Sequence, residues 1–210
     1  MTPGGTSTRT VDPAELDRQG VFRLLTAIVV PRPIAWTSTV SDGGTRNLAP
    51  FSFFTVVSTE PPMLALTIEA APGGGVKDTL RNLRTTGEFV VNTVSVDQAR
   101  QLDLTGVDHA QEVDEFALAG VTPLASTRVR PPRVAEAGIS VECVLHSLLT
   151  PGSDTLVIGE VVAFHIADEL LTATGRIDVA RLRPLGRVAS RFVDPAHPSG
   201  IVADHRRSEC

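Results

Sequence analysis

The sequence predicts a mainly β protein whose strands form an antiparallel barrel or sandwich with a few flanking helices. About seven segments combine β-branched or aromatic residues with turn residues at their ends, and few segments have helical spacing. Strands and helices do not alternate regularly along the chain, which argues against a doubly wound parallel sheet. The 210 residues fit a single domain, because domains commonly contain about 100–200 residues.

The N-terminal segment predicts little regular structure. Residues 1–11 are polar and contain glycine without periodicity, so we expect a flexible lead. Asp12, followed by a proline and an acidic residue, has the pattern of a helix N-cap and predicts a short helix that Gly20 interrupts. Pro31 and Pro33 then hold the backbone extended, so a strand is expected to follow.

The first half of the chain predicts a meander of antiparallel strands. Residues 34–41 are rich in β-branched side chains and end at an Asp-Gly-Gly turn, after which residues 46–49 return antiparallel. Residues 51–58 and 63–68 are two further strand candidates. Two consecutive prolines separate them, and we expect this junction outside any central strand because proline lacks the N–H that such a strand needs.

The middle of the chain changes to helical spacing. Residues 78–86 place leucines on one side and arginines on the other, and Gly87 is expected to end this helix. Residues 89–94 predict another strand. Residues 97–135 contain short helical patterns that prolines break, so we expect an irregular, partly helical excursion there.

The last part of the chain predicts a long hairpin and a tail. Residues 139–149 and 155–166 have the longest β signals, and the Pro-Gly-Ser-Asp sequence between them is typical of a turn. Residues 170–174 predict one last short pairing. The polar, proline-containing sequence of residues 194–210 predicts a C-terminal tail, so the main domain is expected to span residues 12–193.

Charge and composition exclude several classes of function. The formal net charge of −5 gives no general attraction to nucleic acid or to an anionic membrane. No apolar run reaches the ~18 residues of a membrane helix, and the N-terminus lacks the pattern of a signal peptide. We therefore expect a cytoplasmic protein with no nucleic-acid and no membrane partner, and with Cys143 and Cys210 reduced.

No standard catalytic or metal-binding signature is present in the sequence. The nucleophile elbow, the zinc-protease helix motif and the dinucleotide fingerprint are missing, and the glycine-rich turn before Lys77 lacks the pattern of a phosphate loop. The five histidines are scattered, so we expect no metal site. The catalytic residues stay unassigned at this point.

Hydrogen-bonding residues of the first half form a candidate binding site. Hydroxyls, an amide, an ammonium group and a helix N-terminus together supply donors and positive potential to a phosphate. These groups belong to Thr37, Ser38, Thr39, Asn47, Ser52, Lys77, Asp78 and Thr79. Lys77 is the single lysine of the chain, which favours a specific role for its charge. The alternative is that the hydroxyl residues serve strand propensity and helix capping.

Aromatic residues near these donors predict a second feature of the site. Trp36, Phe51, Phe53 and Phe54 could wall a flat aromatic ligand, with Pro50 fixing the backbone beside it. The alternative is that most of these rings belong to the hydrophobic core, where strand aromatics usually lie.

Several motifs occur in a set order over residues 20–192. They are PRPIAWTST from Pro31, NLAPFSFF from Asn47, the Pro61-Pro62 pair, KDT from Lys77, GEFVVN from Gly87, Glu142-Cys143, LVIGEV from Leu156 and GRID from Gly175. Their order and spacing resemble those of the flavin reductase-like family of FMN-binding split β-barrels. The resemblance implies an antiparallel Greek-key split barrel and a homodimer that holds FMN noncovalently near the subunit interface, with NADH or NADPH as the hydride donor.

The resemblance also assigns roles to individual residues. It implies that the phosphate and ribityl chain contact Thr37, Ser38, Asn47, Ser52, Lys77 and Thr79, and that Asp78 orients Lys77 or caps the helix. It implies that Ala49, Pro50 and Phe51 present backbone to the flavin ring. Two departures bear on the nicotinamide side: the closing segment has one glycine, Gly186, and no tyrosine, and residues 153–155 lack a histidine.

Three functions follow from these residues. The first is an FMN-dependent NAD(P)H oxidoreductase, a flavin reductase that supplies reduced flavin to a separate monooxygenase; because the cofactor performs the hydride chemistry, no acid–base pair is needed. The second is an FMN-binding electron-transfer protein that exchanges electrons with a redox protein partner and has no nicotinamide turnover of its own. The third is a dimeric barrel without a cofactor, in a structural or ligand-scavenging role.

Overall fold

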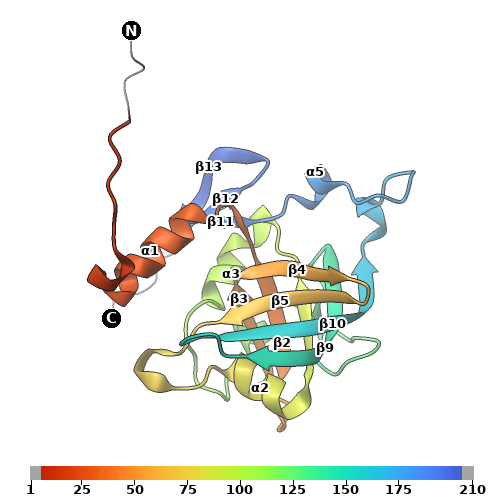
Figure 1. Cartoon of the computed structure of the whole chain (residues 1–210). Coiled ribbons are helices and arrows are strands. Elements are labelled where there is room, and N and C mark those ends of the chain that lie inside the picture. Colours follow the sequence, from red (N-terminus) through yellow and green to blue (C-terminus); the bar gives the residue numbers. More distant parts are fainter. Residues whose placement is uncertain (1–5, 205–210) are drawn as a thin grey trace.

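The computed structural model describes residues 6–204, including all side chains in this range except those of Pro72 and residues 197–204. Its largest element is a seven-stranded sheet in the order β3-β2-β6-β9-β10-β5-β4, in which every neighbouring pair is antiparallel. The strands are β2 (Ala35–Val40), β3 (Arg46–Phe51), β4 (Phe54–Thr59), β5 (Pro62–Ile68), β6 (Glu88–Asn92), β9 (Ile139–Leu149) and β10 (Thr155–Ile166). The sheet curves so that β5 also contacts β3 (Figure 1).

Two smaller sheets make up the rest of the β structure within the described residues. They contain β1 (Arg32–Pro33), β11 (Gly186–Val188), β12 (Arg191–Asp194) and β13 (His197–Asp204) in one sheet, and β7 (Pro123–Leu124) with β8 (Arg133–Val134) in the other. The prediction of a tail from residue 194 is therefore wrong for residues 197–204, which pair with β12. Residues 205–210, with Cys210, lie outside the described residues.

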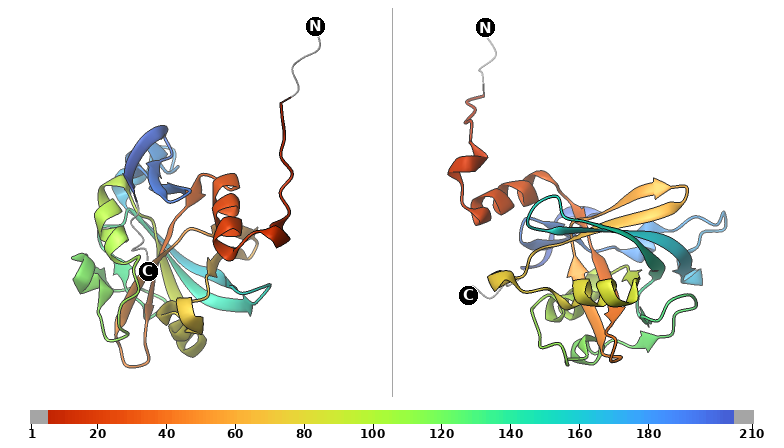
Figure 2. Two further views of the ribbon diagram at one scale, coloured as in Figure 1. Left: turned by 90° about the vertical axis from the view of Figure 1, so that its left-hand side faces the viewer. Right: turned by 60° about the horizontal axis from the view of Figure 1, so that its bottom comes forward.

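The helices are short and lie around the sheet (Figures 1 and 2). The α-helices are α1 (Arg18–Ile28), α2 (Asp78–Thr86), α3 (Ala99–Leu104), α4 (Glu115–Ala119) and α5 (Val179–Leu182). Between residues 6 and 204 the chain also forms four single-turn 3₁₀ helices: η1 (Pro13–Glu15), η2 (Pro72–Gly74), η3 (Val96–Gln98) and η4 (Asp168–Leu170). This arrangement confirms the prediction of a mainly antiparallel β protein with flanking helices, including an irregular excursion over residues 97–135.

The N-terminal helix differs from its prediction. Asp12 caps only η1, and Asp17 caps the longer α1, accepting a hydrogen bond from the backbone N–H of Gly20 at 2.7 Å. Gly20 does not interrupt this helix but lies in its first turn. A Cβ atom at this position would lie 2.9 Å from the capping carboxylate of Asp17, and glycine leaves that space free. Of the expected lead, residues 6–11 are exposed without regular structure and extend away from the sheet (Figure 1), and residues 1–5 lie outside the described residues.

The hydrophobic core has two parts. One lies between the sheet and α2 and includes Phe89, Leu66 and Leu83, all of them almost completely buried. The other lies between β2 and the helical excursion and includes Trp36 and Phe116. These two clusters cover both faces of β2, so its first five residues are all buried. The strand therefore lacks the alternation of buried and exposed side chains that is typical of a strand with one face in solvent.

Candidate functional site

Lys77 stands at the N-terminus of α2, where the chain leaves an extended segment. Its backbone is extended, with φ −61° and ψ 146°, and its side chain is partly buried and forms no capping hydrogen bond. Asp78 follows in the first helical turn and pairs with Arg81 one turn later. The helix N-terminus has positive potential and free backbone N–H groups, so the ammonium of Lys77 adds to a place already suited to an anion.

A cavity of about 350 Å³ opens beside this helix start, and we call it the polar cavity. Its walls come from β3, from α2 with the segment before it, and from the loop that joins α3 to α4. The lining residues are Asn47, Ala49, Pro50, Phe51, Ala71, Val76, Lys77, Asp78, Thr79, Arg81, Thr105, Gly106, Val107, Asp108, His109, Gln111 and Glu115. This set combines cationic, hydroxyl and amide donors with three carboxylates.

A buried hydrogen-bond network supports the floor of the polar cavity. The Asn47 amide lies 3.0 Å from the Thr79 hydroxyl, and Asn82 donates to the Thr39 hydroxyl at 3.0 Å. Turning the amide of Asn47 satisfies all its neighbours: its nitrogen then donates to Glu115, and its oxygen accepts from the hydroxyls of Thr39 and Thr79. The network therefore joins β2, β3, α2 and α4, and it fixes the side chains that the cavity presents.

Glu115 is the buried acid of this cavity, with 7% of its surface exposed. Its carboxylate accepts a hydrogen bond from the backbone N–H of Leu48 at 2.5 Å. Burial raises the pKa of Glu115 to about 7; the negative charges of Asp78, Asp108 and Asp114 add to this, and the Leu48 hydrogen bond opposes it. The polar cavity therefore contains an acid that changes its charge near neutral pH.

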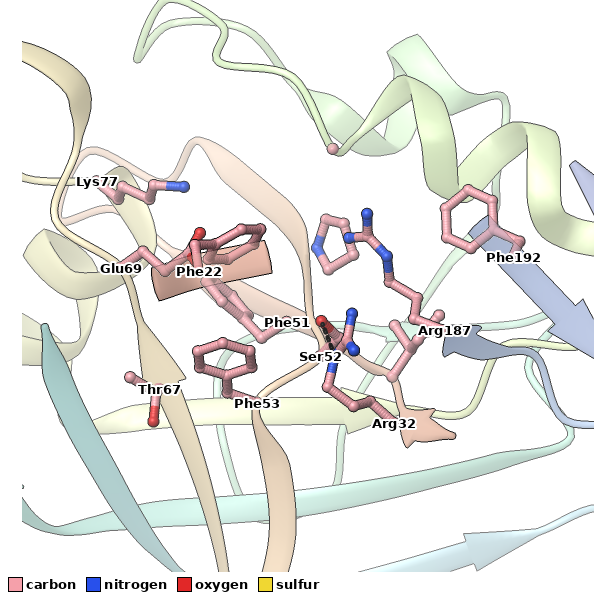
Figure 3. Close-up of a pocket in the computed structure, with 13 residues that line it drawn as sticks. Phe22, Arg32, Phe51, Ser52, Phe53, Thr67, Glu69, Lys77, Arg187 and Phe192 are labelled. Carbon is pink, nitrogen blue, oxygen red and sulfur yellow. Dashed lines mark hydrogen bonds between the residues drawn. The ribbon is translucent and has the colours of Figure 1, made fainter. Parts of the chain in front are cut away.

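A second, smaller cavity of about 60 Å³ adjoins the first, and we call it the aromatic cavity (Figure 3). The two cavities share Pro50, Phe51, Lys77 and Gly106. The remaining lining residues are Phe22, Arg32, Ile34, Ser52, Phe53, Thr67, Glu69, Arg187 and Phe192. The rings of Phe22 and Phe53 stack with their centroids 6.3 Å apart, and the guanidinium of Arg187 lies over the ring of Phe192.

Arg32 ties together the walls of the aromatic cavity. Its guanidinium is buried and donates to the carbonyl of Thr26 in α1 at 2.5 Å and to the carbonyl of Ala189 in the β11–β12 turn at 2.9 Å. A longer bond of 3.4 Å runs from its Nε to the hydroxyl of Ser52. Burial lowers the pKa of Arg32, while the charge of Glu69 raises it. One side chain thus connects α1, the end of β3 and the β11–β12 turn.

Comparisons with known proteins identify the family. Residues 27–184 match the model of the flavin reductase like domain. The chain belongs to the flavin reductase-like family. Nitrilotriacetate monooxygenase component B from Bacillus cereus is 32% identical, with a TM-score of 0.86 over 90% of this chain and 96% of that chain. The 2-nitrobenzoate 2-nitroreductase of Pseudomonas fluorescens is 27% identical, with a TM-score of 0.80 over 96% of both chains.

A more distant structure supports the fold alone. A putative flavin reductase with a split barrel domain from Shewanella frigidimarina is 20% identical, with a TM-score of 0.76 over 86% of this chain and 90% of that chain. The predicted fold class, a split barrel of the flavin reductase-like family, is therefore confirmed. Membership of the family supports a flavin-related oxidoreductase.

In this flavin reductase-like chain, most of the predicted site residues meet around the two cavities. Asn47, Ala49, Pro50, Phe51, Lys77, Asp78 and Thr79 line the polar cavity, and Ser52 lines the aromatic one. These residues come from β3 and its end and from the start of α2. The structure therefore brings together the amide, hydroxyl and ammonium donors that the sequence predicted for one ligand.

Four predicted site residues lie elsewhere, since Trp36, Thr37, Ser38 and Thr39 are completely buried on β2 and line neither cavity. The indole N–H of Trp36 donates to the hydroxyl of Thr105 at 2.9 Å, and Ser38 donates to the carbonyl of Pro132 at 2.5 Å. The prediction that Trp36 walls a ligand is not supported, because β2 is a central strand with a core on both faces. Thr39 reaches the site only through the hydrogen-bond network beneath it.

Sequence reasoning missed several residues that line the two cavities. The sequence could have indicated Arg32, because this arginine lies between two prolines inside the first family motif. Glu115 and His109 had no such signal, because a helix, a strand and part of the irregular excursion separate them from Lys77. Phe22 looked like one of several apolar residues of a short helix.

His146, His165 and Cys143 lie outside both cavities. His165 bonds the buried Glu142 at 2.5 Å, and His146 is exposed. Cys143 is a free, buried cysteine, and burial raises its pKa to about 12. Within residues 6–204, no group of three or more metal-ligating side chains is placed to hold a metal ion. No helix in the same range is both long and apolar enough to span a membrane.

Proposed function

We propose that this protein is an FMN-dependent NAD(P)H oxidoreductase that acts as a flavin reductase. One observation carries the proposal: in a member of the flavin reductase-like family, the single lysine, a helix start and the Ala49-Pro50-Phe51 backbone line one cavity. An ammonium group and a helix N-terminus both favour phosphate binding, and an adjoining apolar wall favours a flat ring.

The polar cavity fits the phosphorylated part of FMN. Lys77 offers an ammonium and α2 its N-terminal N–H groups, and both favour a phosphate. The hydroxyl of Thr79 donates to the Asn47 oxygen, so it holds the wall of the cavity in place. Asn47, held by the network below, presents an amide to the hydroxyls of the ribityl chain. Asp78 is paired with Arg81, so it lowers the positive potential of the helix start less than a free carboxylate would.

The adjoining walls offer apolar and aromatic surface to the flavin ring. Pro50 and Phe51 line both cavities, and Ala49 lines the polar cavity. The rings of Phe22 and Phe53 line the aromatic cavity (Figure 3). When bound there, the flavin would take a hydride from NADH or NADPH and a proton from solvent, leaving the oxidised nicotinamide. The residues of the chain bind and orient the two rings and limit the access of water, and Arg32 holds the walls in place.

Reduction of the bound flavin by a nicotinamide tests the proposal directly. We expect purified protein loaded with FMN to absorb in the visible range and to lose that absorbance when NADH or NADPH is added without oxygen. Loaded protein that keeps its flavin oxidised with both nicotinamides would contradict reductase activity.

A separate monooxygenase is the proposed acceptor of the reduced flavin. The support is the similarity to nitrilotriacetate monooxygenase component B, which by its name is one component of a monooxygenase. Monooxygenation coupled only through exchanged flavin should persist when a dialysis membrane separates the two proteins.

A second candidate function is an FMN-binding electron-transfer protein. The small volume of the aromatic cavity, about 60 Å³, favours it, because a nicotinamide ring needs more room than this. A carrier would be reduced rapidly by a protein donor and only slowly by either nicotinamide. Comparing these two reduction rates on one preparation separates the candidates.

We also propose that the protein is a homodimer. An apolar surface at the end of α1 supports this, where Ile28 is 73% and Val29 61% exposed. Exposed apolar patches on a soluble chain commonly mark protein interfaces. Light scattering should give twice the chain mass of 22.3 kDa, and a value for the monomer at micromolar concentration would contradict the proposal.

A further inference from the structure

Glu115 is a carboxylate in the wall of the cavity that we assign to an anionic ligand. It is the first residue of α4, it is 7% exposed, and it lines the polar cavity together with Lys77 and Thr79. A buried carboxylate weakens phosphate binding when it is ionised, because the two negative charges repel strongly in a medium of low polarity. Its presence in this wall therefore requires an explanation.

The hydrogen bonds of Glu115 show what it holds in place. Its carboxylate accepts from the backbone N–H of Leu48 at 2.5 Å, which fixes the middle of β3. It also lies 3.3 Å from the Asn47 nitrogen in the amide orientation that satisfies the network. Asn47 in turn meets the Thr79 hydroxyl, so Glu115 is connected through one side chain to the start of α2.

The charges around Glu115 leave its own charge unbalanced. Asp78 of α2, Asp108 of the α3–α4 loop and Asp114, which caps α4, all face it and disfavour its ionised form. The nearby arginines are already engaged, Arg46 with Asp114 and Arg81 with Asp78. Lys77 and His109 line the same cavity, but in the part of the chain that the structure describes Glu115 forms no ion pair.

We propose that Glu115 is a positioning residue whose protonation state controls the affinity of the polar cavity for a phosphorylated ligand. The neutral form keeps the Leu48 and Asn47 contacts and adds no negative charge beside the phosphate. The ionised form keeps the same contacts but repels the ligand. This inference rests on the proposed function, since it takes FMN as the ligand of the polar cavity.

Binding and protonation are then linked. Burial raises the pKa of Glu115 to about 7, so both forms are present at neutral pH before the ligand arrives. If only the neutral form accepts FMN, affinity falls by up to about tenfold between pH 6 and pH 8. By the same linkage, each FMN that binds above pH 7 takes up a fraction of a proton from the buffer.

The experiment compares two substitutions that each remove one negative charge. Glu115→Gln keeps an oxygen for the Leu48 N–H and cannot ionise, whereas Glu160→Gln makes the same change on the exposed face of β10, outside both cavities. Dissociation constants of FMN and of riboflavin are measured by fluorescence at pH 6, 7 and 8 for wild type and both variants. The phosphate of FMN itself titrates near pH 6, but it does so equally in all three proteins.

The expected result is specific to one variant and one ligand. As the pH rises, the FMN affinities of wild type and Glu160→Gln fall relative to that of Glu115→Gln, by up to about tenfold at pH 8. The riboflavin affinity changes little in all three proteins. Equal pH dependence in wild type and Glu115→Gln would overturn the inference and leave the proposed function intact. Failure of wild type to bind FMN at every pH would instead overturn the proposed function.

A measurement on wild type alone covers the case in which Glu115→Gln does not fold. At pH 7.5 the FMN phosphate is already almost fully ionised, so proton uptake reports on the protein. Calorimetric titrations in two buffers with different heats of ionisation should show uptake with FMN and none with riboflavin. Equal proton exchange with the two ligands would refute the role of Glu115.

Discussion

Arg32 offers the sharpest test of how the walls of the aromatic cavity are held. Its guanidinium donates to carbonyls from two distant segments, Thr26 at 2.5 Å and Ala189 at 2.9 Å, and more weakly to Ser52. Arg32→Lys keeps the positive charge but loses the planar fork, so an ammonium can reach one of the two carbonyls at best.

The magnitude follows from the bonds that are lost. A hydrogen bond from a charged group contributes about 1.5–3 kcal/mol, so the loss of one should lower the free energy of unfolding by about 2 kcal/mol. For a chain of this size, that corresponds to a melting temperature lower by about 4–8 °C. Because α1 carries Phe22 and the β11–β12 turn leads to Phe192, the nicotinamide KM should also rise while the FMN dissociation constant stays close to that of wild type.

Urea titration and steady-state kinetics check this prediction, with Arg84→Lys as the control. Arg84 is exposed near the end of α2 and lines neither cavity, so its replacement should change neither quantity. If Arg32→Lys unfolds at the same urea concentration as Arg84→Lys, the assignment of Arg32 as the connection between these segments is refuted.

Two further predictions concern stability. Burial raises the pKa of Glu142, but hydrogen bonds from the Thr127 and Arg128 backbone and from His165 lower it below 4.5 overall. Ionised Glu142 therefore stabilises the fold above pH 4.5, and this contribution is lost as the pH falls through the lowered pKa of Glu142. In urea titrations, Glu142→Gln should lower the free energy of unfolding by about 2–4 kcal/mol at pH 7 and by less at pH 3. An equal decrease at both pH values would contradict this prediction. Gly159→Ala should destabilise by about 1–3 kcal/mol or prevent folding, because the added carbon would lie 2.3 Å from the Phe89 ring, and wild-type thermal stability would contradict the close packing.

The sequence was most informative where local signals and tertiary structure agree. The helix predicted over 78–86 has the bounds of α2, and Gly87 ends it in the left-handed conformation with φ 67°. The hairpin predicted over 139–149 and 155–166 has the bounds of β9 and β10. Both depend on residues close in sequence, namely a terminal glycine and a turn between two long apolar runs.

It was least informative where distant segments meet. The polar residues from position 194 have the composition of a tail, yet β13 forms there because β12 offers it an edge to pair with. Trp36, Thr37 and Ser38 have the residue types of a ligand site, but a second core on the far face of β2 buries them. Glu115 enters the site only through the path of an irregular loop, which no periodicity in the sequence records.

The central claim is that the phosphate of FMN binds where Lys77 meets the start of α2. The most direct measurement is the dissociation constant of FMN for the Lys77→Met variant. The control is Arg84→Met, which removes an exposed cation from α2 itself. Lys77→Met should bind FMN at least about tenfold more weakly while riboflavin affinity changes little, since one charge-assisted bond to the phosphate is lost. Unchanged FMN affinity in Lys77→Met, equal to that of Arg84→Met, would contradict the claim.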